Sequence, residues 1–355
     1  MSNSAQLIPA TGPRAATGRL MIIDSQNESI RTDWIRGLEH ELEPGDVLVV
    51  NDAATFPASL QAKVESTGED LEVRLLPARQ PEFRSEAVLL GAGGWREKTE
   101  DRRPPPVLGV HERLRFSSQL TAEVTQVSAV TKRLVSLSFS EKDPAAFWRE
   151  IYRVGKPIQY SYLSEAQKLW SVQTLYGARP WASEIPSAGR PLKSGLLLAL
   201  RRKGVQLATL THATGISSSG EKALDSLLPL PEFFEIPPVS AAKMNRALEQ
   251  GRRVIAVGTS VVRALESQAA ALQGRVAAGA GETALVIHSS PQSSGFRLRV
   301  VSGILTGIHG ADESHFRLLR AFASEECLRT ALERCRQAGF LTHEFGDSAL
   351  ILAHR

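Results

Sequence analysis

Hydrophobic residues follow two different patterns along this chain, and each pattern predicts a different kind of β-structure. Short runs of consecutive apolar residues lie at Arg19–Asp24, Val47–Asn51, Val254–Val257 and Ser348–Leu352. Continuous apolar runs of this length are typical of strands that are covered on both faces. Helical patterns separate several of these runs, and strands that alternate with helices indicate an α/β domain.

The second pattern is alternation, and it fills the region from about residue 61 to residue 140. Apolar residues alternate with Glu and Arg in Leu71–Leu75, and with Ser in Val135–Phe139. Such alternation is typical of half-exposed antiparallel strands. We therefore expect an α/β main domain with an inserted small antiparallel β-barrel domain. The barrel is expected at residues 61–140, and the main domain at residues 1–60 and 141–355.

Further elements are expected on both sides of the Val254–Val257 strand. Helices are expected at Pro144–Val154, Gly195–Lys203, Phe316–Ala323 and Glu325–Ala338. Strands are expected at Val205–Thr211, Thr283–Ile287 and Phe296–Thr306. For the second helix, Ser194 is the predicted N-cap and Gly204 the predicted C-terminal stop.

Length, composition and charge agree with an ordinary globular protein of about two domains. The 355 residues are 42% hydrophobic and 23% charged, with a net charge of +4. This mild positive charge is compatible with an RNA partner and equally with an enzyme that binds small molecules. Cys327 and Cys335 lie on one predicted helix, roughly 12 Å apart along its axis, so no disulfide is expected. No spacing of Cys and His resembles a zinc site, and no metal is expected.

Targeting signals are also missing from the sequence. The N-terminal residues lack the apolar core of a signal peptide, and no apolar run approaches 18 residues. We therefore expect no membrane partner and a cytoplasmic location.

Two segments raise the question of nucleic-acid binding. Gly91–Pro106 is rich in Gly, Pro and charge, and is expected to be a surface loop whose basic residues are either solvated or in contact with RNA. These basic residues are Arg96, Lys98, Arg102 and Arg103. The stretch from Tyr160 to Trp181 is rich in aromatic residues, which either stack on a purine or fill a core or domain interface.

The segment Arg252–Ser267, RRVIAVGTSVVRALES, is the strongest candidate for a ligand site. It reads as a buried strand, a tight turn at Gly258 and a helix capped by Thr259 or Ser260. Backbone N–H groups at the start of such a helix are free to bind an anionic or polar ligand. The alternative is an ordinary strand-to-helix connection with no ligand.

Histidines at predicted strand ends are the candidates for proton transfer. His212, His288 and His309 each follow a predicted strand, and ligands of open α/β sheets gather at the carboxyl ends of strands. Histidine hydrogen-bonds a ribose or moves a proton near neutral pH, although each of the three has a structural alternative. The small-residue turns at residues 186–189 and 213–220 allow a ligand to approach the backbone closely, or serve only as connections.

The Arg252–Ser267 segment resembles the VIAVGTT-x-x-R-x-LE signature of the S-adenosylmethionine:tRNA ribosyltransferase-isomerases of queuosine biosynthesis. Weaker similarities follow in the family's order over nearly the whole chain. They are PGDVLVVND-x-x-x-x-PAS (Pro44–Ser59), VQTLY ending at Tyr176, IPSAG (Ile185–Gly189), Lys203-Gly204-Val205, THATG (Thr211–Gly215), EFFEIP (Glu232–Pro237), TGIH (Thr306–His309) and Gly346-Asp347.

The resemblance implies an α/β domain with an inserted β-barrel, and a reaction in which S-adenosylmethionine donates its ribosyl part. In that reaction the aminomethyl group of the pre-queuosine base in tRNA attacks, adenine and methionine leave, and the ribose rearranges to an epoxycyclopentane. A base must remove an acidic proton beside the sulfonium, and the departing adenine must be stabilised.

Site residues are implied where this chain matches the family's motifs. The implied catalytic residues are His212, His309 and Glu232. The implied substrate-binding residues are Ser187, Ala188, Gly189, Thr214, Gly215, Gly258, Thr259, Thr306 and Asp347.

Departures from the family's pattern are concentrated in loops near the expected site. Arg190-Pro191-Leu192 stands where the family has LHF, a Ser-rich loop follows His212, and Gly310-Ala311 replaces the Leu-Pro of FHLP. Leu227 and Leu230 replace a pair of histidines. The acceptor is therefore either the deazapurine in tRNA or a related small amine. The alternatives to an enzyme are a catalytically silent paralogue that binds S-adenosylmethionine or RNA, and a nonspecific RNA-binding role for the barrel.

Overall fold

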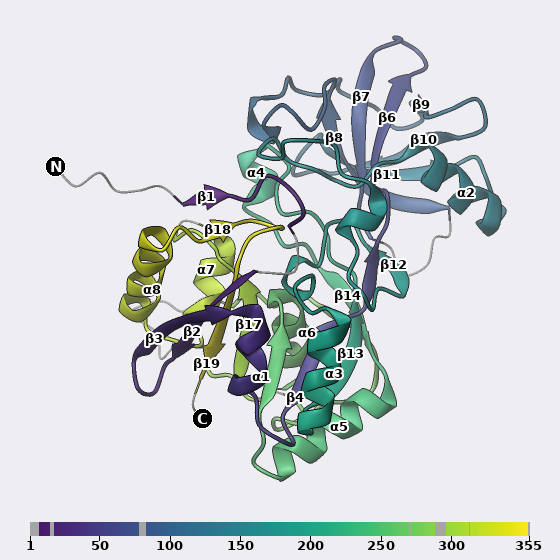
Figure 1. The fold of residues 1–355 in the computed structure, drawn as a ribbon. Coiled ribbons are helices and arrows are strands. Elements are labelled where there is room, and N and C mark those ends of the chain that lie inside the picture. The colour runs from purple at the N-terminus through teal and green to yellow at the C-terminus, as the bar shows by residue number, and fades with distance from the viewer. Residues whose placement is uncertain are drawn as a thin grey trace.

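The larger part of the chain is built around a nine-stranded sheet (Figure 1). This computed structural model describes residues 7–14, 18–77, 83–269, 271–287, 296–311 and 313–353. The strand order is β16 (Gly279–Thr283), β14 (Glu232–Ile236), β13 (Gln206–His212), β4 (Val47–Asn51), β15 (Val254–Val257), β17 (Gly303–Gly307), β19 (Ser348–Leu352), β2 (Arg19–Asp24) and β3 (Ser29–Trp34). The neighbours β13, β4, β15 and β17 are parallel, so their carboxyl ends lie at one edge of the sheet.

Helices cover both faces of the sheet, which explains why its central strands are apolar without alternation. One face packs against α5 (Pro238–Glu249), α6 (Thr259–Ala269), α7 (Ser314–Leu319) and α8 (Glu325–Gln337). The other packs against η1 (Ile35–Gly37), α1 (Leu38–Glu41) and α3 (Ser194–Lys203). All five residues of β4 are buried, as are all five of β19. The prediction of an α/β main domain is confirmed.

Six short strands form a closed barrel that lies above the sheet in Figure 1. Their order is β10 (Thr121–Val127), β11 (Leu134–Phe139), β8 (Arg84–Gly91), β7 (Asp70–Leu75), β6 (Ser59–Val64) and β9 (Arg113–Arg115). The alternating apolar residues of β11 point into the barrel core, which Phe147 and Ile151 of α2 (Pro144–Val154) extend. The prediction of an inserted barrel is confirmed, while the proposed domain boundaries stay a prediction.

Short elements complete the described part of the chain. Two two-stranded sheets pair β1 (Ile8–Pro9) with β18 (Leu341–Thr342), and β5 (Ala53–Thr55) with β12 (Arg179–Ala182). The remaining turns of helix are η2 (Thr99–Asp101), η3 (Leu169–Val172), η4 (Ser187–Gly189) and α4 (Lys222–Asp225). None of the helices in the described ranges is long and apolar enough to cross a membrane.

Two of the expected strands lie elsewhere, for identifiable reasons. The strand expected at Thr283–Ile287 is β16, which ends at Thr283 because its partner β14 begins there, at Glu232, directly after a proline. The strand expected at Phe296–Thr306 begins only at Gly303. The preceding backbone N–H groups of residues 299–301 donate to the Glu266 carboxylate instead of to a neighbouring strand.

Helix ends were predicted with mixed success. Gly204 ends α3 in the left-handed conformation, with φ +95°, as expected. Ser194 is the first helical residue and not the N-cap, which is Lys193 with no side-chain hydrogen bond. The helix expected at Phe316–Ala323 ends at Leu319, because the chain then turns so that the Ser324 hydroxyl accepts from the Cys327 N–H and caps α8.

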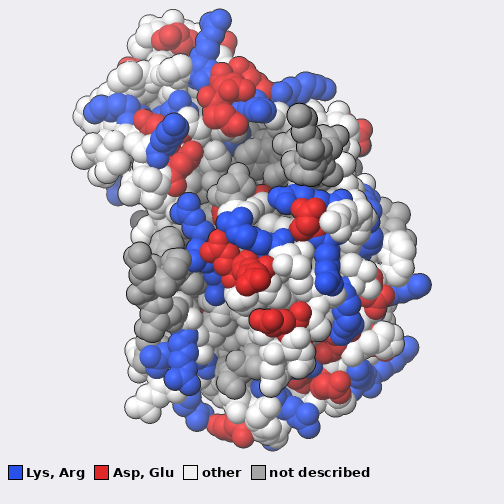
Figure 2. Space-filling view, turned by 90° about the vertical axis from the view of Figure 1, so that its left-hand side faces the viewer, with Lys and Arg blue, Asp and Glu red and all other residues white. Residues whose placement is uncertain are grey.

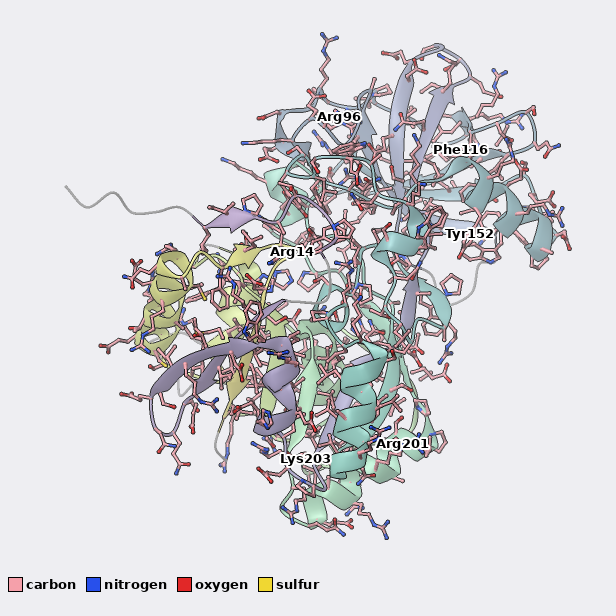
Figure 3. All side chains as sticks on the ribbon, viewed as in Figure 1. Arg14, Arg96, Phe116, Tyr152, Arg201 and Lys203 are labelled. Atoms are coloured by element: carbon pink, nitrogen blue, oxygen red, sulfur yellow. The ribbon has the colours of Figure 1, made fainter. Side chains whose placement is uncertain are left out.

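One of the four basic residues that were considered for RNA contact is buried. The Arg102 side chain forms ion pairs with Glu72, which also pairs with the buried Arg74. Arg102 therefore fastens the Gly91–Pro106 loop to the barrel wall, and its assignment as a surface residue was wrong. Arg96 points away from the barrel, with its guanidinium over the Trp95 ring (Figure 3). The cysteines are free and lie on one helix, α8, as predicted, and both are buried.

Candidate active site

Four strand ends bring most of the candidate residues to one edge of the sheet. Asn51 ends β4 and His212 ends β13, while Gly258 follows β15 and Thr306 is the residue before the last one of β17. Asn51 joins two of these ends, since its side-chain oxygen accepts from the His212 N–H at 2.8 Å and its amide donates to the His212 carbonyl at 3.0 Å. The edge therefore has a rigid backbone frame.

The Gly258 turn holds the first group of candidate substrate-binding residues. Gly258 has φ +90°, a conformation that side chains disfavour, and its N–H donates to the Leu305 carbonyl at 2.8 Å. A Cβ at Gly258 would lie 3.4 Å from the Ala188 Cβ, so the Ser187–Gly189 turn packs against it. Helix α6 begins directly afterwards at Thr259. Ser187, Ala188, Gly189, Gly258 and Thr259 are therefore neighbours in space.

A buried aromatic residue lies under the Ser187–Gly189 turn. A Cβ at Gly189 would lie 2.0 Å from the Tyr176 hydroxyl, so only glycine fits there. The hydroxyl is buried and has no hydrogen-bond partner among the described residues. Burial, followed by the charge of Asp52, raises the pKa of Tyr176. Tyr176 is therefore a neutral donor close to the candidate ligand site.

His212, Glu232 and Arg263 form the second group. Glu232 Oε2 lies 3.6 Å from His212 Nε2 and forms an ion pair with Arg263. Glu232 Oε1 accepts from the Gly215 N–H at 2.8 Å, and Arg263 Nε donates to the Leu285 carbonyl at 2.9 Å. The hydroxyl of Thr214, the residue before Gly215, lies 3.4 Å from the Asn51 amide nitrogen. The group fixes the loop after β13 to β14 and α6.

The His212 ring is neutral and sealed from solvent. Its exposed fraction is 0%, and neither ring nitrogen has a hydrogen-bond partner among the described residues. Burial lowers the pKa of His212 to about 4, the charge of Glu232 opposes this shift, and that of Arg263 adds to it. An imidazole in this state is a weak base, and Glu232 is already neutralised by Arg263.

His309, Glu313 and His315 form the third group, beyond the end of β17. His309 Nδ1 lies 3.1 Å from Glu313 Oε2, and His309 Nε2 lies 3.3 Å from the Thr306 hydroxyl. The His315 ring stacks on the His309 ring with centroids 4.4 Å apart. The charge of Arg263 acts on both His212 and His315, which couples the second and third groups electrostatically.

Charge at the third group is fixed by its surroundings. Burial alone would raise the pKa of Glu313, but the hydrogen bond and charge of His309 lower it to about 2. Burial, followed by the charge of His309, lowers the pKa of His315 to about 3. At neutral pH, Glu313 is therefore a carboxylate and His315 a neutral imidazole. When the Glu313 carboxylate accepts a hydrogen bond from His309 Nδ1–H, the other ring nitrogen, Nε2, keeps its lone pair. This is the arrangement of an oriented general base.

Asp347 lies at the same edge but has structural partners. It directly precedes β19, which pairs with β17. Its buried carboxylate accepts from the side chains of Arg14 and Arg19, and from the backbone N–H groups of Arg19 and Leu341. Figure 3 shows Arg14 between the barrel and the sheet, near β1. These contacts occupy both carboxylate oxygens, whereas a ligand-binding role for Asp347 stays a prediction.

Sequence reasoning missed Arg263, Glu313 and His315 as members of the site. A signal for two of them was present, since His309-x-x-x-Glu313-x-His315 is a compact set of proton-binding and metal-binding side chains. Arg263 stands in the VGTS-x-x-R-x-LE segment, together with the Glu266 that caps residues 299–301. Arg263 and Glu266 therefore hold neighbouring parts of the fold together. His288 lies outside the described residues.

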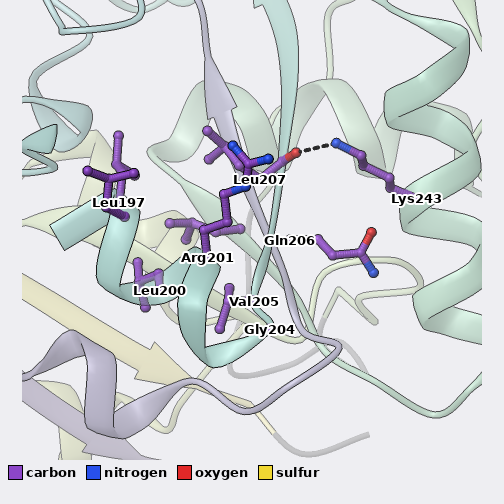
Figure 4. A pocket seen from close by; sticks show the side chains of 10 residues that line it. Leu197, Leu200, Arg201, Gly204, Val205, Gln206, Leu207 and Lys243 are labelled. Atoms are coloured by element: carbon purple, nitrogen blue, oxygen red, sulfur yellow. Dashed lines mark hydrogen bonds between the residues drawn. The ribbon is translucent and has the colours of Figure 1, made fainter. Parts of the chain in front are cut away.

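Outside these three groups, the described surface includes a face of mixed charge and a groove. On the face drawn in Figure 2, basic and acidic side chains are interspersed over both the barrel and the main domain. A groove of about 600 Å³ lies at the opposite edge of the sheet, at the start of β13, between α3 and α5. It is lined by leucines of α3, by Arg201 and by Lys243, whose ammonium donates to the Leu207 carbonyl (Figure 4).

Known proteins resemble this chain over nearly its whole length. A model of the family described as queuosine biosynthesis protein matches residues 5–351. An S-adenosylmethionine:tRNA ribosyltransferase-isomerase from Thermus thermophilus is 32% identical over 94% of this chain and 92% of its own length. One from Gloeobacter violaceus is 31% identical, with 94% and 89% covered.

The fold also has a counterpart among solved structures. The crystal structure of an S-adenosylmethionine tRNA ribosyltransferase from Thermotoga maritima superposes with a TM-score of 0.52 over 98% of both chains, at 23% identity. This likeness agrees with the α/β domain and barrel described above. The chain therefore belongs to the queuosine biosynthesis protein family, whose matching members are the enzymes named S-adenosylmethionine:tRNA ribosyltransferase-isomerases.

Proposed function

We propose that this enzyme transfers the ribosyl part of S-adenosylmethionine to an amine-bearing deazapurine in tRNA and isomerises it, releasing adenine and methionine. The observation that carries the proposal is the hydrogen-bonded row of Thr306, His309 and Glu313 beside the Gly258 turn. The Gly258 N–H bonds to Leu305, the residue before Thr306, so a donor held at the turn lies next to this row. The names of the relatives support the same reaction.

The donor is assigned to the turn formed by Ser187–Gly189 and Gly258-Thr259. Glycine at 189 and 258 lets a ligand meet the backbone, and the α6 N-terminus favours the donor's methionine carboxylate. The Tyr176 hydroxyl, buried and unpartnered beneath Gly189, is available to donate a hydrogen bond to an atom of the donor. Thr306 lies between this turn and His309 and is assigned to the donor's ribose.

Proton removal beside the sulfonium is assigned to His309. Glu313 accepts from Nδ1–H, so Nε2 takes the proton, and the imidazolium that forms is stabilised by the Glu313 carboxylate. The amine bonds to a ribosyl carbon and loses a proton, the bonds to adenine and to methionine break, and adenine takes up one proton. Methionine leaves with the electron pair of its carbon–sulfur bond. The carbon that lost its proton to His309 forms the carbon–carbon bond that closes the five-carbon ring, and the ribose ring oxygen bridges two ring carbons as the epoxide.

His212 and Glu232 are assigned to positioning in place of proton transfer. Both are enclosed, and Arg263 already neutralises Glu232. The contact between Glu232 and the Gly215 N–H holds the Thr214-Gly215 turn beside the donor site. Loss of either side chain is expected to act through the shape of this turn.

A related small amine-bearing deazapurine is the alternative acceptor, and Arg190 favours it. Arg190 stands where the family's LHF begins, and its guanidinium donates to the carbonyls of Glu344 and Ser171 and lies over the Phe345 ring, 4.1 Å from the centroid. Burial lowers the pKa of Arg190 to about 10. An arginine held by these contacts offers an acceptor different hydrogen bonds from those of a histidine.

The proposal is tested by measuring adenine and methionine release by mass spectrometry. The full-length protein is incubated with S-adenosylmethionine alone, with tRNA carrying the pre-queuosine base, and with the free base. Release that requires the tRNA supports the proposal, whereas release with the free base only moves the acceptor to a small molecule. No release in any mixture, from protein that is folded, overturns the proposal and favours the silent paralogue.

Variants of two histidines sharpen this test. His309→Gln removes the assigned base, and turnover is expected to fall by about 100-fold or more. His111→Gln is the matched control, because His111 also pairs with a glutamate, Glu123 at 2.7 Å, but lies exposed on the barrel. Equal turnover in the two variants would remove His309 from the proton transfer.

A further inference from the structure

The third group of the site has a feature that proton transfer does not require. One ligand-type atom from each of His309, Glu313 and His315 lies within 4.8 Å of the other two. A histidine–carboxylate pair alone serves a general base, whereas a second imidazole stacked on the first adds another nitrogen donor. Two imidazoles and one carboxylate are the donor set of many protein sites for zinc and related ions.

Two of these side chains have a hydrogen bond from outside the group that fixes which atom faces it. Glu313 Oε1 accepts from the Gly310 N–H at 2.8 Å, which leaves Oε2 to face His309. In the other tautomer of His309, Nε2 carries the proton and donates to the Thr306 hydroxyl at 3.3 Å, which leaves Nδ1 as the coordinating atom. Metal-binding histidines and carboxylates have such outer partners, because these partners fix the tautomer and the direction of the lone pair.

The charge of the group also suits a cation. It combines one carboxyl group with two imidazoles, the donor types that ions of the zinc class prefer. Arg263, whose charge acts on His315, is paired with Glu232. His343 also acts electrostatically on Glu313, and its ring stacks on Tyr162 with centroids 4.4 Å apart.

We propose that His309, Glu313 and His315 form a binding site for a divalent transition-metal ion of the zinc class. Tetrahedral coordination with bonds of about 2.0–2.2 Å places ligand atoms roughly 3.3 Å apart. His309 Nδ1 and Glu313 Oε2 already have this spacing, at 3.1 Å. The His315 ring lies at 10° to the His309 ring, so it must turn out of this stack for its nitrogen to complete the set. The fourth position is left for water.

This site has a consequence for catalysis that rests on the proposed function. A metal bound to His309 Nδ1 keeps the ring proton on Nε2, so Nε2 has no lone pair for the substrate's proton. Metal binding and base catalysis at His309 are therefore mutually exclusive, and zinc is expected to inhibit turnover by competing for one side chain.

Cobalt(II) titration of the tag-free, full-length protein tests the site, because its visible absorption reports coordination without any turnover. One cobalt ion per chain is expected to bind and to be displaced by zinc. Glu313→Gln and His315→Leu are each expected to weaken binding by at least about tenfold. His111→Gln, which alters the exposed His111–Glu123 pair, is the matched control and is expected to bind as the wild type does.

Circular dichroism and thermal unfolding of the metal-free variants show whether each is folded. Absence of a cobalt signal in folded wild-type protein overturns the proposal, and so does equal cobalt affinity in Glu313→Gln and wild type. Failure of the proposed function leaves cobalt binding unchanged, because the titration needs no substrate. Conversely, turnover that is unchanged at a zinc concentration that displaces all the cobalt removes His309 Nε2 as the base and leaves the metal site standing.

Discussion

At the scale of single residues, Glu344 is half-buried, and one of its carboxyl oxygens is enclosed in the fold. Its Oε2 atom has no hydrogen-bond partner among the described residues, and burial raises its pKa to about 7 from 4.5. The unfolded chain releases this proton near pH 4.5, whereas the folded protein holds it up to about pH 7. Stability from this group is therefore fully present below pH 4.5 and is lost as the pH rises through about 7.

Glu344→Gln removes this dependence, because the amide is neutral at every pH. We expect the variant to be more stable than the wild type at pH 8 by up to about 3 kcal/mol, and the difference to shrink toward zero near pH 4. Urea denaturation at the two pH values measures it. Glu165→Gln, at an exposed position, is the control. A difference that does not change with pH would show that Glu344 is not buried in its protonated form.

At the scale of secondary-structure elements, the Arg263–Glu232 pair joins α6 to β14. Both side chains are nearly buried, and Arg263 also bonds to the Leu285 carbonyl. Removing one partner leaves a buried charge, so Arg263→Met and Glu232→Gln are each expected to reduce the free energy of unfolding by about 3–5 kcal/mol. The double variant is expected to lose much less than the sum.

A double-mutant cycle by chemical denaturation measures this coupling. The exposed pair of Arg329 and Glu325 on α8, at 2.7 Å, is the comparison, and its coupling is expected to be about 0.5 kcal/mol or less. Additive losses at Arg263 and Glu232 would mean that the two charges are solvated independently, and that the loop after β13 is held by its backbone alone.

Elements could be predicted where their own apolar or alternating residues indicate burial. Elements whose bounds depend on a partner distant in the sequence could not. β2, β4 and β19 follow directly from their apolar runs, and the barrel from alternation. Residues 284–287 look like a strand, but none of the described strands pairs with them, because β14 begins opposite Thr283. In the site, His309 was predictable from its position after a strand. The partner of Glu232 was not, because Arg263 reaches it from another element.

At the scale of the whole molecule, Asp347 connects the two ends of the chain. Arg14 and Arg19 come from the N-terminal region, and Asp347 precedes the last strand of the sheet. Burial alone would raise the pKa of Asp347, but backbone hydrogen bonds from Arg19 and Leu341 and the charge of Arg19 lower it from 3.8. The stability that it contributes is therefore present above pH 3.8 and is lost as the pH falls further.

The resemblance implies a substrate-binding role for Asp347, and the contacts imply a role in fastening the chain ends, so the two roles must be separated by experiment. Asp347→Asn keeps the shape but removes the charge that both arginines share. We expect a loss of about 3 kcal/mol in the free energy of unfolding at pH 7, and no change in KM for S-adenosylmethionine at a temperature where the variant is folded. Unchanged stability with a raised KM would reverse the assignment, since the carboxylate would then act on the donor.

If both stability and KM change, the variant Arg14→Gln separates the two roles. It removes one of the two arginine partners and leaves the carboxylate charge of Asp347 in place. A change in stability alone would keep Asp347 among the residues that hold the fold together.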